Sequence, residues 1–311
     1  MKEGEYEFLL MDRIQKIQSI DRKYNLNENA HISFSGGKDS TILHYLMDMA
    51  LPGNEIPRVY INTGIEYKAI QNFVASLSEK DSRVVIVKPK TLIKPMLESE
   101  GYPMKSKFHS YILSMFQQGK HNESIDKYVE GVYGHEKACP DKLKYQFSEN
   151  FKLKVSPKCC DEIKKAPLHE YEENSKRRIG ITGIRQNEGG QRDYLENCII
   201  TAKNGSLQRF HPLLVVTDEW ESEFIKRNNI QLCELYYPPY NFRRTGCVGC
   251  PFNRFLQKDL ETLMLLLPNE WKLAEAVWKP VYEEYRRIGY RLKPVLQPKL
   301  WSLTTEEIEV D

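Results

Sequence analysis

A glycine-rich segment, SGGKDS at residues 35–40, stands between a predicted strand and a predicted helix. The strand is expected over HISFS at 31–35. The helix is expected over 38–50, where apolar residues recur at helical spacing. The alternation then continues with a strand at 57–63, a helix at 67–78 and a strand at 83–89. Strands that alternate with helices form βαβ units, and runs such as VVIV fit strands buried on both faces. The sequence therefore predicts an α/β fold with a Rossmann-like parallel sheet.

The alternation stops near residue 100 and resumes later in the chain. Residues 100–150 are polar and predict an insertion of helices and loops. Strand patterns return at 178–184 and 198–202, and helical patterns cover 217–228 and 253–289, with Pro268 starting a new helix. We expect a nucleotide-binding α/β domain over 1–235 and a second region over 236–311, which holds a CxxC loop and a helical C-terminal element.

The composition excludes several classes of protein. The chain has 45 Lys+Arg and 43 Asp+Glu, a formal charge of +2, which argues against a strong non-specific nucleic-acid binder. No apolar run approaches the ~18 residues of a membrane span, and MKEGEYEFLL lacks the features of a signal peptide. A cytoplasmic location and no membrane partner are expected. In that reducing compartment, seven cysteines suggest metal ligands or catalytic groups.

The SGGKDS segment has the chemistry of a phosphate-binding loop. Adjacent glycines let the backbone approach a ligand, and the first turn of the following helix presents N–H groups to an anion. Lys38 adds a positive charge, and the acid Asp39 is suited to assist a Mg²⁺ ion that bridges phosphates. The spacing matches neither the Walker A motif nor GxGxxG. A capped helix after a glycine turn explains fewer of the six predicted phosphate-binding residues, which are Ser35, Gly36, Gly37, Lys38, Asp39 and Ser40.

Four cysteines form two pairs, Cys159 with Cys160 and Cys247 with Cys250. Four thiolates fit either a structural zinc ion or an iron–sulfur cluster. Adjacent cysteines are awkward for one zinc ion, whose ligands are usually spaced C-x₂₋₄-C, so the spacing favours a 4Fe–4S cluster with zinc as the alternative. Buried apolar cysteines without a metal are the remaining interpretation.

These motifs together resemble the PP-loop ATP pyrophosphatase (adenine nucleotide α-hydrolase-like) superfamily, whose signature is SGGxDS. Within it, KCCDEIKKAPL from Lys158 is similar to the CCxxRKxxPL segment of the iron–sulfur phosphoadenylylsulfate (PAPS) reductase family. The resemblance implies that the loop binds ATP or an adenylyl sulfate with Mg²⁺. It also implies that one 4Fe–4S cluster is held by Cys159, Cys160, Cys247 and Cys250.

Further segments extend the resemblance over most of residues 28–252. NTGIEY looks like the family's second-strand motif, which implies that Thr63 and Gly64 lie near the adenosine. TGIRQNEGGQR resembles an element whose arginines face the phosphate or sulfate, which here implies Arg185 and Arg192. With Lys38 and Asp39, these two arginines are the predicted catalytic residues. The segments GYPMKSK, FHPLL and TDEW also have counterparts in the family.

Three other positions have open interpretations. Glu188 matches an acid of the family's arginine element, but a plain loop acid is the simpler interpretation. Arg243 and Arg244 precede the CxxC, where they would contact a phosphate or the cluster's sulfurs, or form a solvated pair.

The chain departs from the assimilatory reductases in one respect. Those enzymes carry a nucleophilic cysteine in a Glu-Cys-Gly-x-His motif near the C-terminus, whereas this chain has no cysteine after Cys250. Cys139 is a candidate substitute or a simple loop cysteine, and Cys198 and Cys233 are expected in the core. Without the thiol, two roles stay open. One is activation by ATP followed by sulfur transfer, and the other is reaction of an adenylyl sulfate with an outside thiol.

Three classes of function follow. The first is an enzyme, either a PAPS reductase-like oxidoreductase or an ATP-pyrophosphatase-type sulfurtransferase. The second is a non-catalytic nucleotide- or redox-binding module. The third is a nucleic-acid modifier of the DNA phosphorothioation or tRNA thiolation type, because residues 142–158 interleave lysines with aromatic residues. The expected partners are an adenine nucleotide, a sulfur donor or thiol reductant protein, and for the third class a nucleic-acid acceptor. The sequence does not set the oligomeric state.

Overall fold

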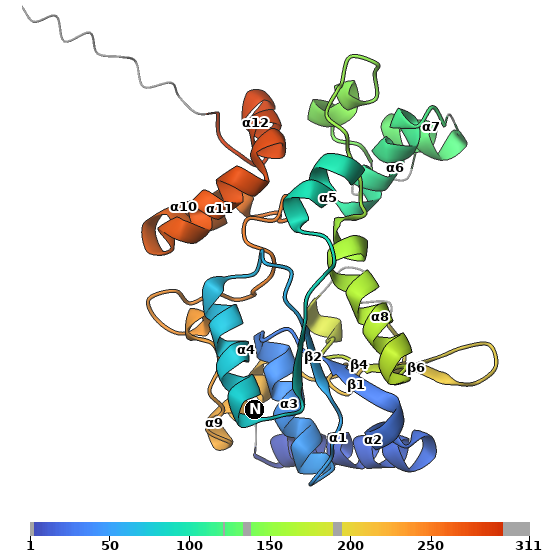
Figure 1. Ribbon diagram of the computed structural model, residues 1–311, viewed down its shortest axis with the longest axis vertical. Coiled ribbons are helices and arrows are strands. Elements are labelled where there is room, and N and C mark those ends of the chain that lie inside the picture. Colours follow the sequence, from blue (N-terminus) through green and yellow to red (C-terminus); the bar gives the residue numbers. More distant parts are fainter. Residues whose placement is uncertain (1–2, 121, 133–137, 189–194, 295–311) are drawn as a thin grey trace, which may run out of the picture. The chain divides into compact units, whose positions relative to one another are not determined.

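The computed structural model describes residues 3–120, 122–132, 138–188 and 195–294. Its elements are drawn in Figure 1. Contacts group the chain into two compact units. The first joins Met1–Gly101 to Lys158–Val248, and the second joins Tyr102–Pro157 to Gly249–Asp311. The domain boundary expected at residue 235 stays a prediction, because contacts alone do not test which segments fold independently.

The first unit is built on a six-stranded sheet in the order β3-β2-β1-β4-β6-β5. Every neighbouring pair is parallel except β5 with β6, which is antiparallel. This confirms the predicted α/β fold with a mostly parallel sheet. The strands are β1 (Ala30–Ser33), β2 (Arg58–Ile61), β3 (Val84–Val87), β4 (Ile179–Ile181), β5 (Ile199–Thr201) and β6 (Leu207–Phe210).

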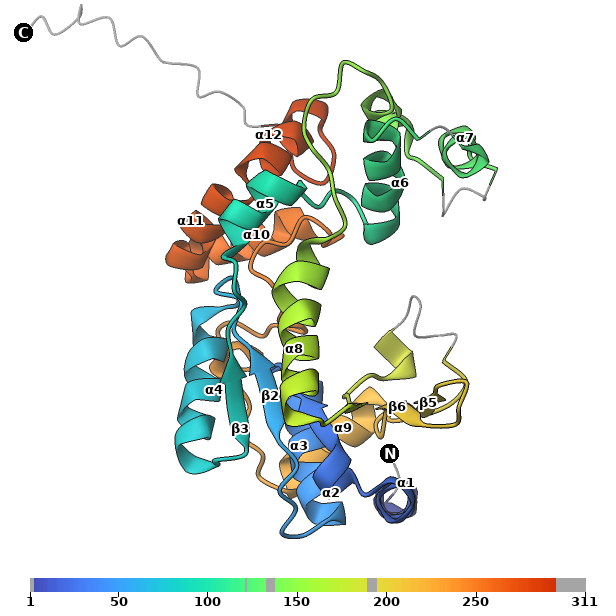
Figure 2. The same cartoon turned by 45° about the vertical axis from the view of Figure 1, so that its right-hand side comes forward.

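Helices cover the sheet of the first unit. Contacts join α8 to β2 and β3, and α4 to β3, and Figure 2 shows α4 and α8 on opposite sides of these strands. The main core lies where α1, α3 and α9 meet the sheet, and there Trp220 stacks on Phe224 with ring centroids 4.8 Å apart. The helices are α1 (Glu3–Tyr24), α2 (Leu26–Asn29), α3 (Lys38–Ala50), α4 (Lys68–Lys80), α5 (Ile93–Glu100), α8 (Ala166–Ser175) and α9 (Asp218–Arg227).

Two expectations about strands need correction. The VVIV run of β3 predicts a strand buried on both faces, but β3 is an edge strand and Ile86 is 38% exposed. Strand β6 has no counterpart among the predicted strands, because a four-residue LQRF segment with two polar residues has little apolar pattern. The predicted strand at 198–202 corresponds to β5, which pairs with this unpredicted neighbour.

The second unit is helical, as the insertion at 100–150 and the C-terminal region predict. A small core gathers Ile112, Ile125, Tyr128, Cys139 and Leu143. Pro268 begins a helix as expected, and Pro280 lies in the first turn of the next. The elements are α6 (Lys107–Gln117), α7 (Glu123–Glu130), the 3₁₀ turn Asp141–Gln146, α10 (Leu256–Leu266), α11 (Pro268–Val277) and α12 (Lys279–Ile288).

Helix α12 fixes the backbone that follows Val248. The Tyr282 hydroxyl donates a hydrogen bond to the Gly249 carbonyl. The Pro251 carbonyl accepts from the Tyr285 hydroxyl at 3.2 Å and from Arg291 at 2.6 Å. Cys250 is therefore placed between two anchored residues of the second unit.

Within the described ranges, no helix has both the length and the apolar character needed to span a bilayer.

Candidate nucleotide site

The SGGKDS loop connects β1 to α3 and is held by its own serines. The Oγ atoms of Ser35 and Ser40 lie 3.0 Å apart, and Ser35 Oγ accepts from the Gly37 N–H at 3.2 Å. Ser40 Oγ donates to the Gly37 carbonyl at 2.9 Å. Gly36 has a φ of +69°, and a Cβ there would lie 2.7 Å from Val74 Cγ2. The glycine is therefore required both by the turn and by the packing of α4.

The first turn of α3 is tied to the segment before the CxxC. The Lys38 N–H donates to the Tyr236 hydroxyl at 2.9 Å, and this hydroxyl lies 2.9 Å from Thr245 Oγ1. Burial raises the pKa of Tyr236, so the phenol stays protonated at neutral pH. The neutral hydroxyl of Tyr236 therefore links the SGGKDS loop to Thr245.

Beside the loop, two cations and three acids form a charge cluster, which we define as Lys38, Asp39, Arg185, Asp218 and Glu221. The Lys38 Nζ lies 2.7 Å from a Glu221 oxygen. Arg185 Nε lies 3.0 Å from Glu221 and 3.3 Å from Asp39, and Arg185 Nη1 lies 2.8 Å from Asp218. Burial lowers the pKa of Arg185, but Glu221, Asp39 and Asp218 together raise it above its usual value. Three of the four predicted catalytic residues therefore lie together.

Glu221 is the member of the charge cluster that no motif predicts. Its side chain is fully buried. Burial, and secondarily the charge of Asp39, raise its pKa to about 8 against the opposing effect of Lys38 and Arg185. A helical wheel would have found it, because Glu221 shares the buried face of α9 with Trp220 and Phe224.

A polar cavity of about 230 Å³ opens at the loop. Its walls come from the start of α3, from the segment after β4, and from the residues before the CxxC. It includes both arginines whose role the sequence left open. Its lining residues are Ser33, Ser35, Gly37, Lys38, Asp39, Ser40, Gly183, Ile184, Tyr236, Arg243, Arg244 and Thr245.

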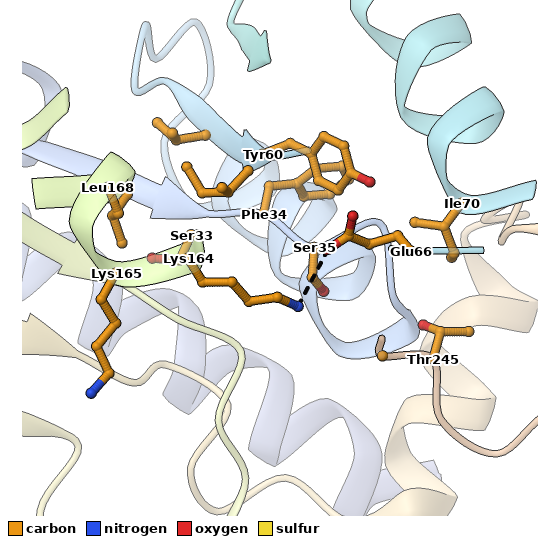
Figure 3. Close-up of a pocket in the computed structure, with 13 residues that line it drawn as sticks. Ser33, Phe34, Ser35, Tyr60, Glu66, Ile70, Lys164, Lys165, Leu168 and Thr245 are labelled. Atoms are coloured by element: carbon orange, nitrogen blue, oxygen red, sulfur yellow. Dashed lines mark ion pairs between the residues drawn. The ribbon is translucent and has the colours of Figure 1, made fainter. Parts of the chain in front are cut away.

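A mostly apolar cavity, also of about 230 Å³, lies over β1 and β2. Figure 3 shows Phe34, Tyr60 and Leu168 around it, with Lys164 reaching toward Glu66 near Ser35. Ser33, Ser35 and Thr245 line both cavities, so the mostly apolar cavity and the polar cavity lie next to each other at the SGGKDS loop. A ligand with a flat apolar ring and an anionic tail fits this arrangement.

Four predicted nucleotide-site residues that the structure describes, Gly36, Thr63, Gly64 and Arg185, line neither cavity. Thr63 is buried and donates from its N–H and hydroxyl to Glu66, at 3.0 and 2.7 Å. Gly64 is exposed with a φ of +79°. Arg192 lies outside the described residues. The assignment of these residues to the nucleotide stays a prediction.

The cysteines predicted as ligands are divided between the units. Cys159, Cys160 and Cys247 belong to the first unit, and Cys250 belongs to the second. Cys159 is buried, and the other three are partly exposed. Burial and the neighbouring Cys160 raise the pKa of Cys247, while Lys164, which hydrogen-bonds to this thiol, lowers it.

Among the residues that the structure describes, no three His, Cys, Asp or Glu side chains converge to hold a metal ion. The support for an iron–sulfur region is therefore the sequence pattern of the four cysteines.

Cys139 is not suited to act as the missing nucleophile. It is 3% exposed within the small core of the second unit. Burial raises its pKa to about 11, against the opposing charge of Lys105, so the thiolate is scarce at neutral pH. Cys233 is buried as expected, and Cys198 is partly exposed beside the main core.

The lysine-rich segment 142–158 has contacts within the chain. Lys142 donates to the Gly289 carbonyl at 3.0 Å, Lys144 pairs with Asp141 at 2.8 Å, and Lys158 pairs with Glu100 at 2.6 Å. These contacts favour the structural interpretation of the segment over a nucleic-acid surface. His211 is likewise structural, since Thr182 Oγ1 lies 2.7 Å from its Nδ1.

Comparison with known proteins gives one family. Residues 29–253 match the model of the phosphoadenosine phosphosulfate reductase domain. An uncharacterized protein, MJ0973 of Methanocaldococcus jannaschii, is 31% identical over an alignment 155 residues long that covers 45% of this chain. The match spans only 36% of the length of that protein.

Several solved structures match this chain at low sequence identity and with TM-scores below 0.5. The phosphate complex of PAPS reductase from Candida auris matches with a TM-score of 0.44 and 12% identity, over 79% of this chain and 96% of that one. FMN adenylyltransferase from Candida glabrata in complex with ATP matches with a TM-score of 0.47 and 17% identity, over 79% of this chain and 62% of that one. NH₃-dependent NAD synthetase from Campylobacter jejuni matches with a TM-score of 0.39 and 14% identity, over 90% of this chain and 95% of that one.

Proposed function

Because this chain belongs to the phosphoadenosine phosphosulfate reductase family, we propose that it binds an adenine nucleotide, ATP or an adenylyl sulfate, across the two adjacent cavities. The observation that carries the proposal is the shared border at Ser33, Ser35 and Thr245. The apolar cavity would take the adenosine, and the polar cavity would take the phosphates or sulfate.

The proposed chemistry is positioning and charge neutralisation. Lys38, Arg243 and Arg244 line the polar cavity and supply positive charge where phosphate negative charge would lie. The N-terminus of α3 borders the same cavity and adds its helix dipole. Orienting a nucleotide in this way favours displacement at one of its anionic centres without a covalent intermediate on the protein.

Two displacements fit this role. With ATP and Mg²⁺, a substrate oxygen attacks the α-phosphorus and pyrophosphate leaves, after which a sulfur nucleophile displaces AMP. With an adenylyl sulfate, an outside thiol attacks sulfur, the sulfur–oxygen bond breaks and AMP leaves. The burial of Cys139 supports a thiol from a separate molecule in the second case. Titrating the protein with ATP–Mg²⁺, adenylyl sulfate and its 3′-phosphorylated form distinguishes the two.

Replacement of Lys38 by alanine is expected to weaken binding of the preferred nucleotide by about tenfold. The reason is that a hydrogen bond to a charged group contributes roughly 1.5 kcal/mol or more. Isothermal titration calorimetry measures the effect. The matched control is Lys226→Ala, an exposed lysine in the last turn of α9. Equal affinity in both variants would remove Lys38 from the site.

We also propose that Cys159, Cys160, Cys247 and Cys250 hold a 4Fe–4S cluster, with zinc as the alternative. The support is the pattern of the cysteines and the membership of the family. A bound cluster would supply redox or sulfur-handling capacity.

Iron, sulfide and zinc analysis of anaerobically purified protein tests the ligand set. Cys247→Ser is expected to lose most of the bound iron, or zinc, because a serine hydroxyl replaces a thiolate ligand. It is expected to keep nucleotide affinity, since Cys247 lines neither cavity. Cys198→Ser serves as the control. Wild-type protein without iron and zinc, after anaerobic reconstitution, would contradict the ligand set.

Two further kinds of partner follow from the proposed chemistry. An outside thiol reductant or sulfur donor is required by either displacement. A nucleic-acid acceptor would belong to the sulfurtransferase version, and a strong preference for ATP over adenylyl sulfates would favour it.

A further inference from the structure

We propose that Lys38 exchanges Glu221 for the nucleotide's phosphates on binding, and that Glu221 takes up one proton as it loses this partner. The inference rests on the proposed nucleotide site. On this proposal, nucleotide binding is coupled to the uptake of a proton. Glu221, a buried residue outside the glycine-rich loop, then has a positioning role through Lys38.

The geometry of Glu221 leaves it dependent on two cations. Its side chain is fully buried, and neither carboxylate oxygen has a hydrogen bond of good geometry among the residues that the structure describes. The negative charge of the Glu221 carboxylate is balanced by Lys38 at 2.7 Å and by Arg185 at 3.0 Å. A buried carboxylate that loses a cationic partner becomes costly unless it is neutralised.

Lys38 is the partner that a phosphate can remove. It lines the polar cavity and its side chain is 25% exposed, whereas the Arg185 side chain is 6% exposed. Arg185 also keeps Asp39 and Asp218 as partners. One ammonium group is thus positioned between a buried carboxylate and the space proposed for phosphates.

Three charged groups act on Glu221 and set the direction of the effect. Lys38 and Asp39 come from α3, and Arg185 comes from the segment after β4. Asp218, at the start of α9, pairs with Arg185 and Lys38. Asp39 and burial favour the protonated form of Glu221, and Lys38 and Arg185 favour the ionised form. Turning Lys38 toward phosphate removes one of the two cations that keep Glu221 ionised. The proton then comes from the solvent, and the charge of Lys38 is retained.

The pH window follows from the raised pKa of Glu221, which lies at about 8 in the free protein. Well below this pH the carboxyl is protonated before and after binding, so no proton is taken up. Above it, the free protein carries a carboxylate and the complex carries a carboxylic acid. Binding should therefore weaken as the pH rises, by up to about tenfold per pH unit for one linked proton.

Isothermal titration calorimetry with ATP–Mg²⁺ and with adenylyl sulfate counts the protons, when each titration is made at one pH in two buffers that hold that pH and differ in their heat of ionisation. At pH 8.5–9 we expect an uptake that approaches one proton per bound nucleotide, and at pH 6.5 close to none. The terminal phosphate of ATP, with a pKa near 6, is already ionised at the higher pH and contributes little.

Two variants separate Glu221 from other titrating groups. Glu221→Gln keeps the shape and removes the charge, so its affinity should be the same at pH 7 and pH 9, with no proton uptake at either. The wild type should lose about tenfold in affinity over this interval. Glu219→Gln, an exposed acid on the same helix, should behave as the wild type.

The outcomes are distinct. Binding with equal heats in both buffers at pH 8.5–9 would overturn the proton exchange and leave the nucleotide site standing. Proton uptake that persists in Glu221→Gln would assign the proton to another group and also overturn it. Absence of binding by either nucleotide would overturn the proposed function and this inference together. If Glu221→Gln does not fold, the proton count of the wild type still decides.

Discussion

Gly249→Ala is expected to lower the free energy of unfolding of the protein by about 2–5 kcal/mol, because overpacking and a left-handed backbone both oppose the new methyl group. Gly249 has a φ of +60°, and a Cβ there would overlap the Tyr282 hydroxyl and lie 2.6 Å from Ala274 Cβ. The side chain of Ala274 is too short to move aside, and the tyrosine would lose its bond to the Gly249 carbonyl.

Urea unfolding monitored by far-ultraviolet circular dichroism measures the change. The matched control is Gly246→Ala, three residues earlier, where no atom lies within 4 Å of the position that the new methyl group would take and φ is not in the left-handed region. If both variants unfold at the same urea concentration, α11 and α12 do not pack on Gly249. Because Cys250 is the next residue, the Gly249 variant should also lose any metal that Cys250 helps to hold.

Gly183→Val should reduce nucleotide affinity by roughly a hundredfold or more, since displacing positioned groups by about 1 Å is enough for such losses. A Cβ on Gly183 would lie 2.9 Å from the Asp39 carbonyl oxygen and 3.2 Å from the Ser40 nitrogen. These are backbone atoms in the first turn of α3, which cannot swing away like a side chain. The turn that presents N–H groups to the proposed phosphates would have to move.

Calorimetric titration with the preferred nucleotide tests this variant. Gly4→Val is the control, because Gly4 has no neighbour within 4 Å and lies in α1. An unchanged thermal unfolding midpoint with lost affinity would locate the effect in the loop. Retained affinity in Gly183→Val would show that the contact between α3 and the segment that follows β4 is not needed for binding.

Much of the first unit could be predicted because its signals are local. The helix predicted over residues 38–50 has the same bounds as α3. Its signals are the spacing of apolar residues along the helix and the two glycines directly before it, and both can be read from a short segment of sequence. The strands predicted over 57–63 and 178–184 are longer at both ends than the observed β2 and β4. The edge position of β3 could not be predicted, because strand order depends on pairing between segments far apart in the sequence.

The candidate site was predictable only in part, for the same reason. Lys38, Asp39 and Arg185 follow from motifs, and the structure brings them together. Glu221 has no motif, and TDEWESEF contains four acids of which only this one is fully buried. The importance of Glu221 comes from the packing of α9 on α3, which joins residues about 180 positions apart. Likewise, a CxxC pattern says nothing about whether distant thiols converge.

The position of β1 between β2 and β4 has a consequence for the evolution of the site. From β1 the chain passes to β2 on one side, whereas from β4 it passes to β5 and β6 on the other, so the segments leaving these strands diverge. Parallel sheets bind ligands at such a reversal of strand order, because the segments that leave the two strands in opposite directions leave a crevice between them. Substitutions in the loops can therefore alter which anion is preferred while the crevice persists. This separation of shape from selectivity would let one scaffold serve several nucleotide chemistries.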